Sequence, residues 1–174
     1  GIPLVVIECK DEDVAEPMSE AFSQIQRYSN LRVIDDPFAD GVEEGCERLF
    51  HTNLFSVITH GIEARCGTIS ADFDFYHNWK DIFPEEYADG INIEPSQRQE
   101  ILIKGMFNHE ILIDIFRNFT LFTQKSGSYV KIICRYQQYR AVGKMINKLQ
   151  SGTDWKSRSG VIWHTQGSGK SFTM

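Results

Sequence analysis

The chain opens on an apolar run that predicts a buried strand. Residues 2–10 read IPLVVIECK, and the run of apolar side chains ends in a glutamate, a cysteine and a lysine. After a polar loop, Pro17 suits the first turn of a helix, and apolar residues then recur at helical spacing. This pattern predicts a helix that continues to about Ser29–Asn30.

In the middle of the chain, apolar residues recur at the shorter spacing of strands. Alternating apolar residues predict strands at Phe55–Thr59 and Glu63–Ile69, with a turn near His60–Gly61. The aromatic and acidic stretch that follows has no clean period, and we expect it to be a packed irregular region.

Helical spacing returns at Ser96, which is a candidate cap for a short helix that Gly105 would end. Asn108 is a candidate cap for a second helix. Its expected apolar face consists of Ile111, Leu112, Ile115, Phe116 and Phe119. We expect helices over residues 96–122 and a linker at Gln124–Gly127.

In the last part of the chain, the spacing of apolar residues alternates between that of strands and that of helices. YVKIICR predicts a strand, Gln137–Leu149 a helix, Ser151–Ser159 a polar loop and GVIWH another strand. A strand, a helix and a strand in this order are typical of the start of a parallel α/β domain. The boundary with the preceding domain is expected between about Gly90 and Lys125, with the helices as a connector.

Composition limits the possible classes without selecting one. The chain has 174 residues, 41% hydrophobic and 24% charged residues and a formal net charge of −6, which are values of an ordinary globular protein. The net charge argues against a protein that coats nucleic acid, although a local basic groove would still permit DNA chemistry. Four dispersed cysteines have no zinc-binding spacing and predict reduced thiols in a cytosolic protein, and no apolar run is long enough for a membrane span.

The most specific pattern is VIWHTQGSGKS near the end of the chain. Gly167 and Gly169 would let consecutive backbone N–H groups surround phosphate oxygens. Lys170 would contact the β- and γ-phosphates, and the hydroxyl of Ser171 would bind Mg²⁺. His164 stands where the first glycine of a complete phosphate-binding loop is expected. The alternative is a glycine-rich turn with an incidental lysine.

A second candidate is RYQQYRAV, which precedes that lysine by about thirty residues and resembles the adenine-reading glutamine motif of superfamily 2 helicases. Its best adenine-reading residue is Gln138, because a primary amide can donate to and accept from the base edge at once. Arg135 and Tyr136 could flank the base by stacking. The alternative is a polar helix start without a ligand.

The charges that end the first strand form the third candidate. Alternation along a strand places Glu8 and Lys10 on one face, beyond apolar residues that partly desolvate them. A carboxylate there can bind Mg²⁺, and an ammonium can orient a metal-bound water, as phosphodiester cleavage requires. The alternative is a strand end that meets solvent. Gln24 and Tyr28 lie on one side of the following helix and could reach the same site. The alternative is that they are ordinary residues at the rim of the apolar face.

Over essentially its whole length, the chain resembles the restriction (R, motor) subunit of type I restriction–modification enzymes. The resemblance rests on five stretches in this order: VVIECK, QIQRY, EARCGT, RYQQYRAV and HTQGSGKS. Superfamily 2 helicases of this kind tolerate the loss of the first loop glycine. The resemblance implies an α/β protein with part of a PD-(D/E)xK nuclease domain at residues 1–95, a helical connector at 96–125 and the start of a RecA-like ATPase lobe at 126–174.

The resemblance also implies functions for individual residues. Glu8 would be a ligand of the nuclease Mg²⁺, Lys10 the catalytic lysine, and Gln24 and Tyr28 the associated Q-x-x-x-Y pair. ATP and its Mg²⁺ would be bound by Gln138, Gly167, Ser168, Gly169, Lys170 and Ser171. The implied partners are double-stranded DNA and the methyltransferase and specificity subunits, in the cytoplasm of a bacterium or archaeon.

The nuclease pattern further requires an aspartate on a strand before VVIECK, and the ATPase requires motifs after Met174. We therefore expect residues 1–174 alone neither to cut DNA nor to hydrolyse ATP. Two other interpretations stay open: a superfamily 2 ATPase whose N-terminal domain only binds DNA or docks, and a repair or type III-like nuclease–helicase with other partners.

Overall fold

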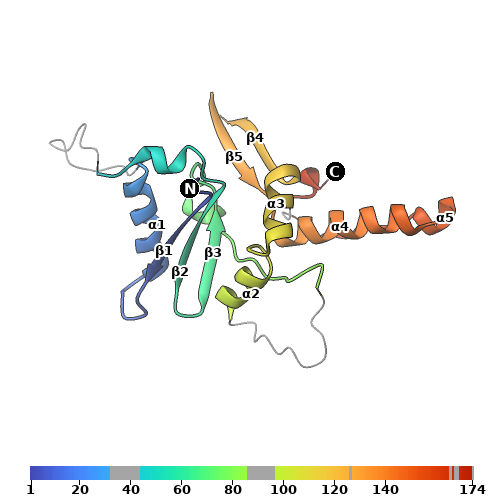
Figure 1. The fold of residues 1–174 in the computed structure, drawn as a ribbon, viewed down its shortest axis with the longest axis horizontal. Helices are drawn as coiled ribbons and strands as arrows, with labels where there is room; N and C mark the ends of the chain where they lie inside the picture. Colours follow the sequence, from blue (N-terminus) through green and yellow to red (C-terminus); the bar gives the residue numbers. More distant parts are fainter. Residues whose placement is uncertain (32–43, 86–96, 126, 165, 167–168, 174) are drawn as a thin grey trace.

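A computed structural model gives the fold of residues 1–31, 44–85, 97–125, 127–164, 166 and 169–173. The described part is a mixed α/β structure with a three-stranded sheet, a separate two-stranded hairpin and helices around them (Figure 1). No helix in these ranges is long and apolar enough to cross a membrane.

The three-stranded sheet has the order β1-β2-β3. It consists of β1 (Val5–Lys10), β2 (Phe55–His60) and β3 (Glu63–Gly67). β1 runs parallel to β2, and β2 runs antiparallel to β3. A parallel pair needs a crossover between its strands, which α1 (Pro17–Tyr28) provides here.

Helix α1 covers one face of this sheet (Figure 1). The side chains of Met18, Ala21 and Ile25 are buried there and pack with Ile58 of β2 in one apolar cluster. Their spacing is that of a single helix face, so the predicted helix is confirmed. It ends at Tyr28, one residue before the predicted end.

The opposite face of the sheet carries the larger core. Phe55 and Val57 of β2 pack there with Trp79 and with the helices α2 (Arg98–Lys104) and α3 (His109–Asn118). The predicted cap of α3 is confirmed, because the Oδ1 atom of Asn108 accepts a hydrogen bond of 3.0 Å from the backbone N–H of Glu110. Short 3₁₀ helices, η1 (Glu47–Phe50) and η2 (Phe73–Phe75), lie in the intervening segments.

The same core continues into the second half of the chain without interruption. It includes Ile111 and Ile115 of α3, Ile133, and Tyr139 of the next helix. The packing joins all three parts of the predicted division at residues 95 and 125. It does not test that division, which stays a prediction.

The expected helical stretch to residue 122 and the linker at Gln124–Gly127 are wrong. Helix α3 ends at Asn118, and β4 (Thr120–Lys125) then pairs antiparallel with β5 (Ser128–Ile133). Gly127, which precedes β5, has a φ of 85°, a conformation that favours glycine at a tight turn. Leu121 and Phe122, at the end of the expected helical stretch, instead belong to β4 of a hairpin that projects from the body (Figure 1).

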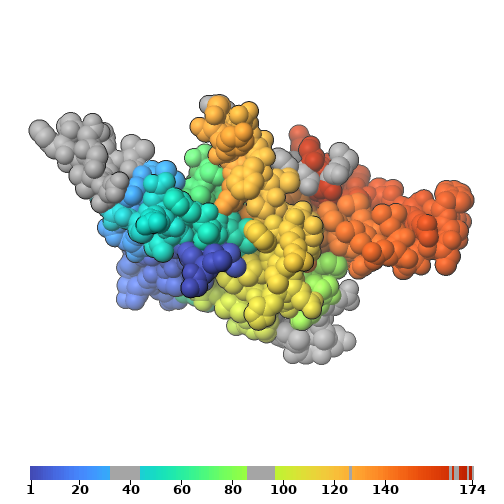
Figure 2. Space-filling model, turned by 45° about the horizontal axis from the view of Figure 1, so that its top comes forward, coloured from blue at the N-terminus to red at the C-terminus, as the bar shows by residue number. Residues whose placement is uncertain are grey.

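After β5 the chain forms α4 (Tyr136–Ser151), as predicted, and then a short helix α5 (Trp155–Arg158) inside the expected polar loop. Together α4 and α5 form an arm that extends from the body (Figure 2). The strand expected at GVIWH is wrong: residues 160–164 form no strand, since no described residue pairs with them. Val161 and Trp163 are 91% and 88% exposed.

Candidate functional sites: a strand-end ion pair and a nucleotide loop

The first site lies at the end of β1 and is built by strand alternation. Glu8 and Lys10 lie on one face, as predicted, and the Nζ atom of Lys10 is 3.1 Å from Oε1 of Glu8. Their side chains are only 14% and 17% exposed. Val6 on the same face packs into the apolar cluster beneath α1, so the ion pair lies where the apolar part of that face ends. A solvated strand end would leave both charges far more exposed.

Neighbouring strands extend this polar edge with residues that the sequence did not single out. In the parallel register His60 lies beside Lys10. Glu63 accepts from Arg65 at 2.7 Å, and its second carboxylate oxygen is 3.7 Å from Nε2 of His60. The Nδ1 atom of His60 is buried without a hydrogen-bond partner among the described residues. The alternation in THGIEAR was the available signal, because partners in register share a face.

Gln24 and Tyr28 lie on α1, which packs on the face that carries Glu8 and Lys10. Both side chains are half-buried, and Tyr28 packs against the apolar cluster under the helix. Among the described residues, no hydrogen bond or ion pair joins either side chain to Glu8 or Lys10. The common face is therefore as expected, whereas a catalytic role for these two residues stays a prediction.

The described residues contain no group of three or more histidine, cysteine, aspartate or glutamate side chains that could hold a metal ion. Glu8 supplies a single carboxylate to this edge, and Mg²⁺ is usually held by one or two carboxylates together with waters and substrate phosphates. Glu8 could therefore supply one carboxylate ligand to a hard cation at this edge.

The second site surrounds the glycine loop. Gly169 has a φ of 76°, and the backbone then turns into a three-residue 3₁₀ helix, η3 (Lys170–Phe172), instead of a regular helix. Lys170 and Ser171 are exposed. The predicted phosphate-binding residues Gly167 and Ser168 lie outside the described residues.

Gln138 connects the start of α4 to this loop. Its side chain is buried, its Oε1 atom accepts from the backbone N–H of Arg135 at 2.7 Å, and its Nε2 atom donates to the carbonyl of Gly169 at 2.9 Å. The structure therefore brings together two motifs that the sequence separates by 31 positions. Because both functions of the amide engage the backbone, adenine reading by Gln138 would require it to exchange these partners.

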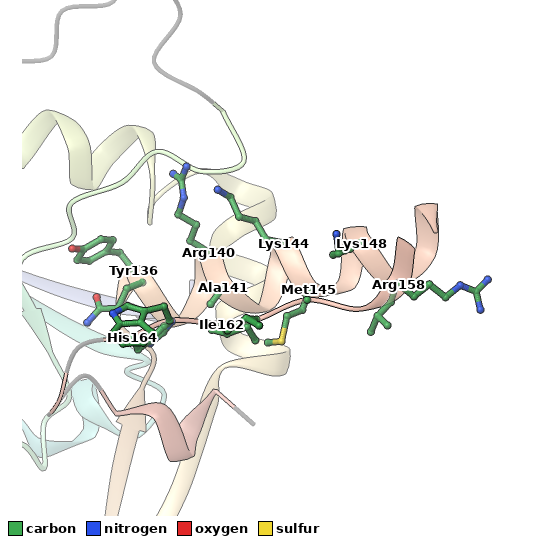
Figure 3. A pocket seen from close by; sticks show the side chains of 14 residues that line it. Tyr136, Arg140, Ala141, Lys144, Met145, Lys148, Arg158, Ile162 and His164 are labelled. Carbon is green, nitrogen blue, oxygen red and sulfur yellow. The ribbon is translucent and has the colours of Figure 1, made fainter. Parts of the chain in front are cut away.

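The two residues expected to stack on the base line different cavities. Tyr136 lines a cavity of about 660 Å³ along α4, together with Lys144 and His164 (Figure 3). Arg135 lines another cavity, of about 570 Å³, together with Gln138 and Gly169. Only Arg135 accompanies Gln138 beside the glycine loop, so the two side chains do not flank one base position here.

Two family descriptions match this chain. Residues 1–75 match the type I restriction enzyme R protein N terminus, and residues 137–174 match the SWI2/SNF2 ATPase. The type I restriction enzyme HindI endonuclease subunit of Haemophilus influenzae is 34% identical over 177 residues that cover 100% of this chain and 15% of that protein. Over its whole length the chain is therefore similar to part of a type I restriction enzyme R subunit.

A more distant relative of this chain is the putative type I restriction enzyme MjaIXP endonuclease subunit of Methanocaldococcus jannaschii. It is 25% identical over 191 residues, which cover 100% of this chain and 16% of that protein. The chain thus spans about a sixth of the length of the curated relatives that it matches. The R protein match covers the strand-end ion pair, and the ATPase match covers Gln138 and the glycine loop.

Proposed function

We propose that this chain is part of an ATP-dependent type I restriction endonuclease subunit, which translocates double-stranded DNA and cleaves it with a metal-dependent nuclease. The observation that carries the proposal is the presence of both half-buried strand-end charges and a glutamine-linked glycine loop in one chain. Relatives that cover its whole length are named endonuclease subunits of such enzymes.

In the nuclease site, Glu8 would bind Mg²⁺ and Lys10 would orient the attacking water and offset charge on the phosphate. The support is the ion pair of 3.1 Å with both side chains mostly buried, since burial strengthens the effect of each charge on a bound phosphodiester. Mg²⁺ would supply charge neutralisation at the scissile phosphate. Gln24 and Tyr28 would line the site from α1.

In the ATPase site, Gly167, Ser168 and Gly169 would hold the triphosphate with backbone N–H groups. Lys170 would neutralise phosphate charge, and Ser171 would be a ligand of the Mg²⁺ that accompanies ATP. Gln138 would fix the loop through Gly169 and read adenine after exchanging that partner. ATP hydrolysis would drive movement along DNA.

We further propose the domain arrangement that this function implies. Residues 1–95 would belong to a PD-(D/E)xK nuclease domain, 96–125 to a connector that comprises α2, α3 and β4, and 126–174 to the first RecA-like lobe. The partners would be double-stranded DNA and the methyltransferase and specificity subunits, in the cytoplasm of the cell.

A second candidate is an ATPase whose N-terminal unit docks without cutting. The observation that favours it is the same ion pair, because Glu8 and Lys10 neutralise one another in the absence of substrate. In that case the pair would stabilise the end of the sheet and have no part in hydrolysis of DNA.

Two substitutions in the intact subunit, assembled with its partners, test the proposal. Lys170→Ala should abolish ATP hydrolysis and, because translocation stops, DNA cleavage as well. Lys10→Ala should abolish cleavage and leave ATP hydrolysis unchanged. Lys104→Ala is a matched control, since Lys104 is an exposed lysine that pairs with Glu100 on α2. Cleavage that persists in Lys10→Ala would favour the docking alternative, and ATPase activity that persists in Lys170→Ala would contradict the phosphate-loop assignment.

A further inference from the structure

The cavity of about 570 Å³ beside Gln138 is lined by three parts of the chain. The N-terminal unit (residues 1–95) contributes Asp72 and His77, and the β4–β5 hairpin contributes Lys125. The start of α4 and the glycine loop contribute Arg135, Gln138 and Gly169. Its size falls within the range of about 300–1,000 Å³ that is usual for small-molecule sites, which is large enough for a nucleoside.

Hydrogen bonds fix the N-terminal wall of this cavity to β5. The hydroxyl of Thr68 donates to the carbonyl of Lys131 at 2.7 Å, and the backbone N–H of Lys131 donates to the hydroxyl of Ser70 at 2.8 Å. At the rim, the Nζ atom of Lys125 lies 5.7 Å from the centre of the Phe75 ring. Because β5 leads directly into α4, this wall and Gln138 belong to one connected unit.

The charges in the cavity are arranged unevenly. Asp72 is the acidic side chain among its described lining residues, which also include the cationic side chains Lys125, Lys131 and Arg135. A carboxylate repels phosphates but accepts hydrogen bonds from sugar hydroxyls, so it suits the ribose end of a nucleotide. Burial, with a smaller contribution from the charge of Arg135, lowers the pKa of His77, and a neutral imidazole adds no charge there.

We infer that the N-terminal unit forms one wall of the nucleotide site: the nucleoside of ATP bound at the glycine loop occupies this cavity, and Asp72 accepts hydrogen bonds from the ribose hydroxyls. The inference rests on the proposed ATPase function and adds a residue of the N-terminal unit to it. Nucleotide occupancy would thereby be sensed directly by the unit that carries Glu8 and Lys10.

The test compares ATP with 2′-deoxy-ATP in the intact subunit. The unchanged protein should show a KM for 2′-deoxy-ATP about tenfold above that for ATP, the effect of one hydrogen bond to a charged group. Asp72→Ala should raise the KM for ATP and bring the two values close together. Asp72 is exposed and its side chain caps no helix, so the substitution should leave the fold intact.

Asp74→Ala is the matched control, because Asp74 is an exposed aspartate of the same 3₁₀ helix that does not line the cavity. The inference is contradicted if the unchanged protein does not discriminate, or if discrimination survives Asp72→Ala. If Lys170→Ala still abolishes hydrolysis in that case, the proposed ATPase function stands while this inference falls.

Hydrogen exchange gives a readout that does not depend on activity. A non-hydrolysable ATP analogue should slow amide exchange in residues 67–77 of the intact subunit and leave α2 unchanged, since no residue of α2 lines the cavity. Equal exchange in residues 67–77 with and without the analogue, under conditions that protect α4, would show that the N-terminal wall does not contact the nucleotide.

Discussion

The side-chain amide of Gln138 donates a hydrogen bond of 2.9 Å to the carbonyl of Gly169 and so ties the first turn of α4 to the nucleotide loop. The same side chain accepts from the backbone N–H of Arg135 and stabilises the helix start. One buried residue therefore sets both the beginning of α4 and the position of the glycine loop.

Replacing this amide tests its effect on the loop. Gln138→Glu keeps the acceptor for Arg135 but loses the amide donor, which bonds Gly169 here and would bond adenine when ATP is bound. The KM for ATP should therefore rise about tenfold, the cost of roughly 1.4 kcal/mol for one hydrogen bond. Gln137→Glu is the control, because Gln137 lines the other cavity along α4. An equal effect of the two substitutions on the KM for ATP would show that the Gly169 contact has no specific role.

The four cysteines should differ in reactivity. All are free, but Cys9 and Cys46 are exposed whereas Cys66 and Cys134 are buried. Burial raises the pKa of Cys66 to about 12 and raises that of Cys134 as well, so neither thiol ionises near neutral pH. At pH 7.5, N-ethylmaleimide followed by peptide mass mapping should label Cys9 and Cys46 first. Labelling of Cys66 at the rate of Cys9 in the folded protein would contradict the packing described for the sheet.

An ion pair fixes the start of α4 to the segment that follows η2. The Nη1 atom of Arg140 lies 2.9 and 2.7 Å from the two carboxylate oxygens of Asp81, which is buried. Arg140→Ala would remove the ion-pair partner of that carboxylate. We expect the free energy of unfolding to fall by about 1–3 kcal/mol, less than for a fully buried pair because the arginine is partly exposed. Hydrogen exchange in α4 should therefore accelerate.

Lys144→Ala is the control for this substitution, because Lys144 lies one turn further along α4 and is exposed. We expect Lys144→Ala to have only a small effect on amide hydrogen exchange in α4. Similar acceleration by Arg140→Ala and Lys144→Ala would mean that the ion pair does not hold the helix to the body.

Local patterns predicted the elements that local forces determine. Helix α1 follows from its apolar spacing, the cap of α3 from Asn108, and the common face of Glu8 and Lys10 from strand alternation. The residues from Thr120 to Lys125 were misassigned because the pairing with β5, and not their own spacing, makes them a strand.

Contacts between distant segments left no such signal. Thr68 and Lys131 are 63 positions apart, and nothing in the sequence around either one predicts their hydrogen bond. The same holds for Asp81 and Arg140, which are 59 positions apart. The cavity wall formed by the N-terminal unit was therefore not predictable, although Gln138 and the glycine loop were each recognisable as motifs.

A charge exchange at the end of β1 distinguishes a catalytic role of Glu8 and Lys10 from a structural one. Glu8→Lys combined with Lys10→Glu in the intact subunit keeps an ion pair on the same face of the strand but reverses its polarity. We expect DNA cleavage to be lost and ATP hydrolysis to be retained, because a metal-binding carboxylate and a phosphate-facing ammonium cannot change places. Retention of cleavage at the original rate would contradict this expectation and show that the pair has only a structural role.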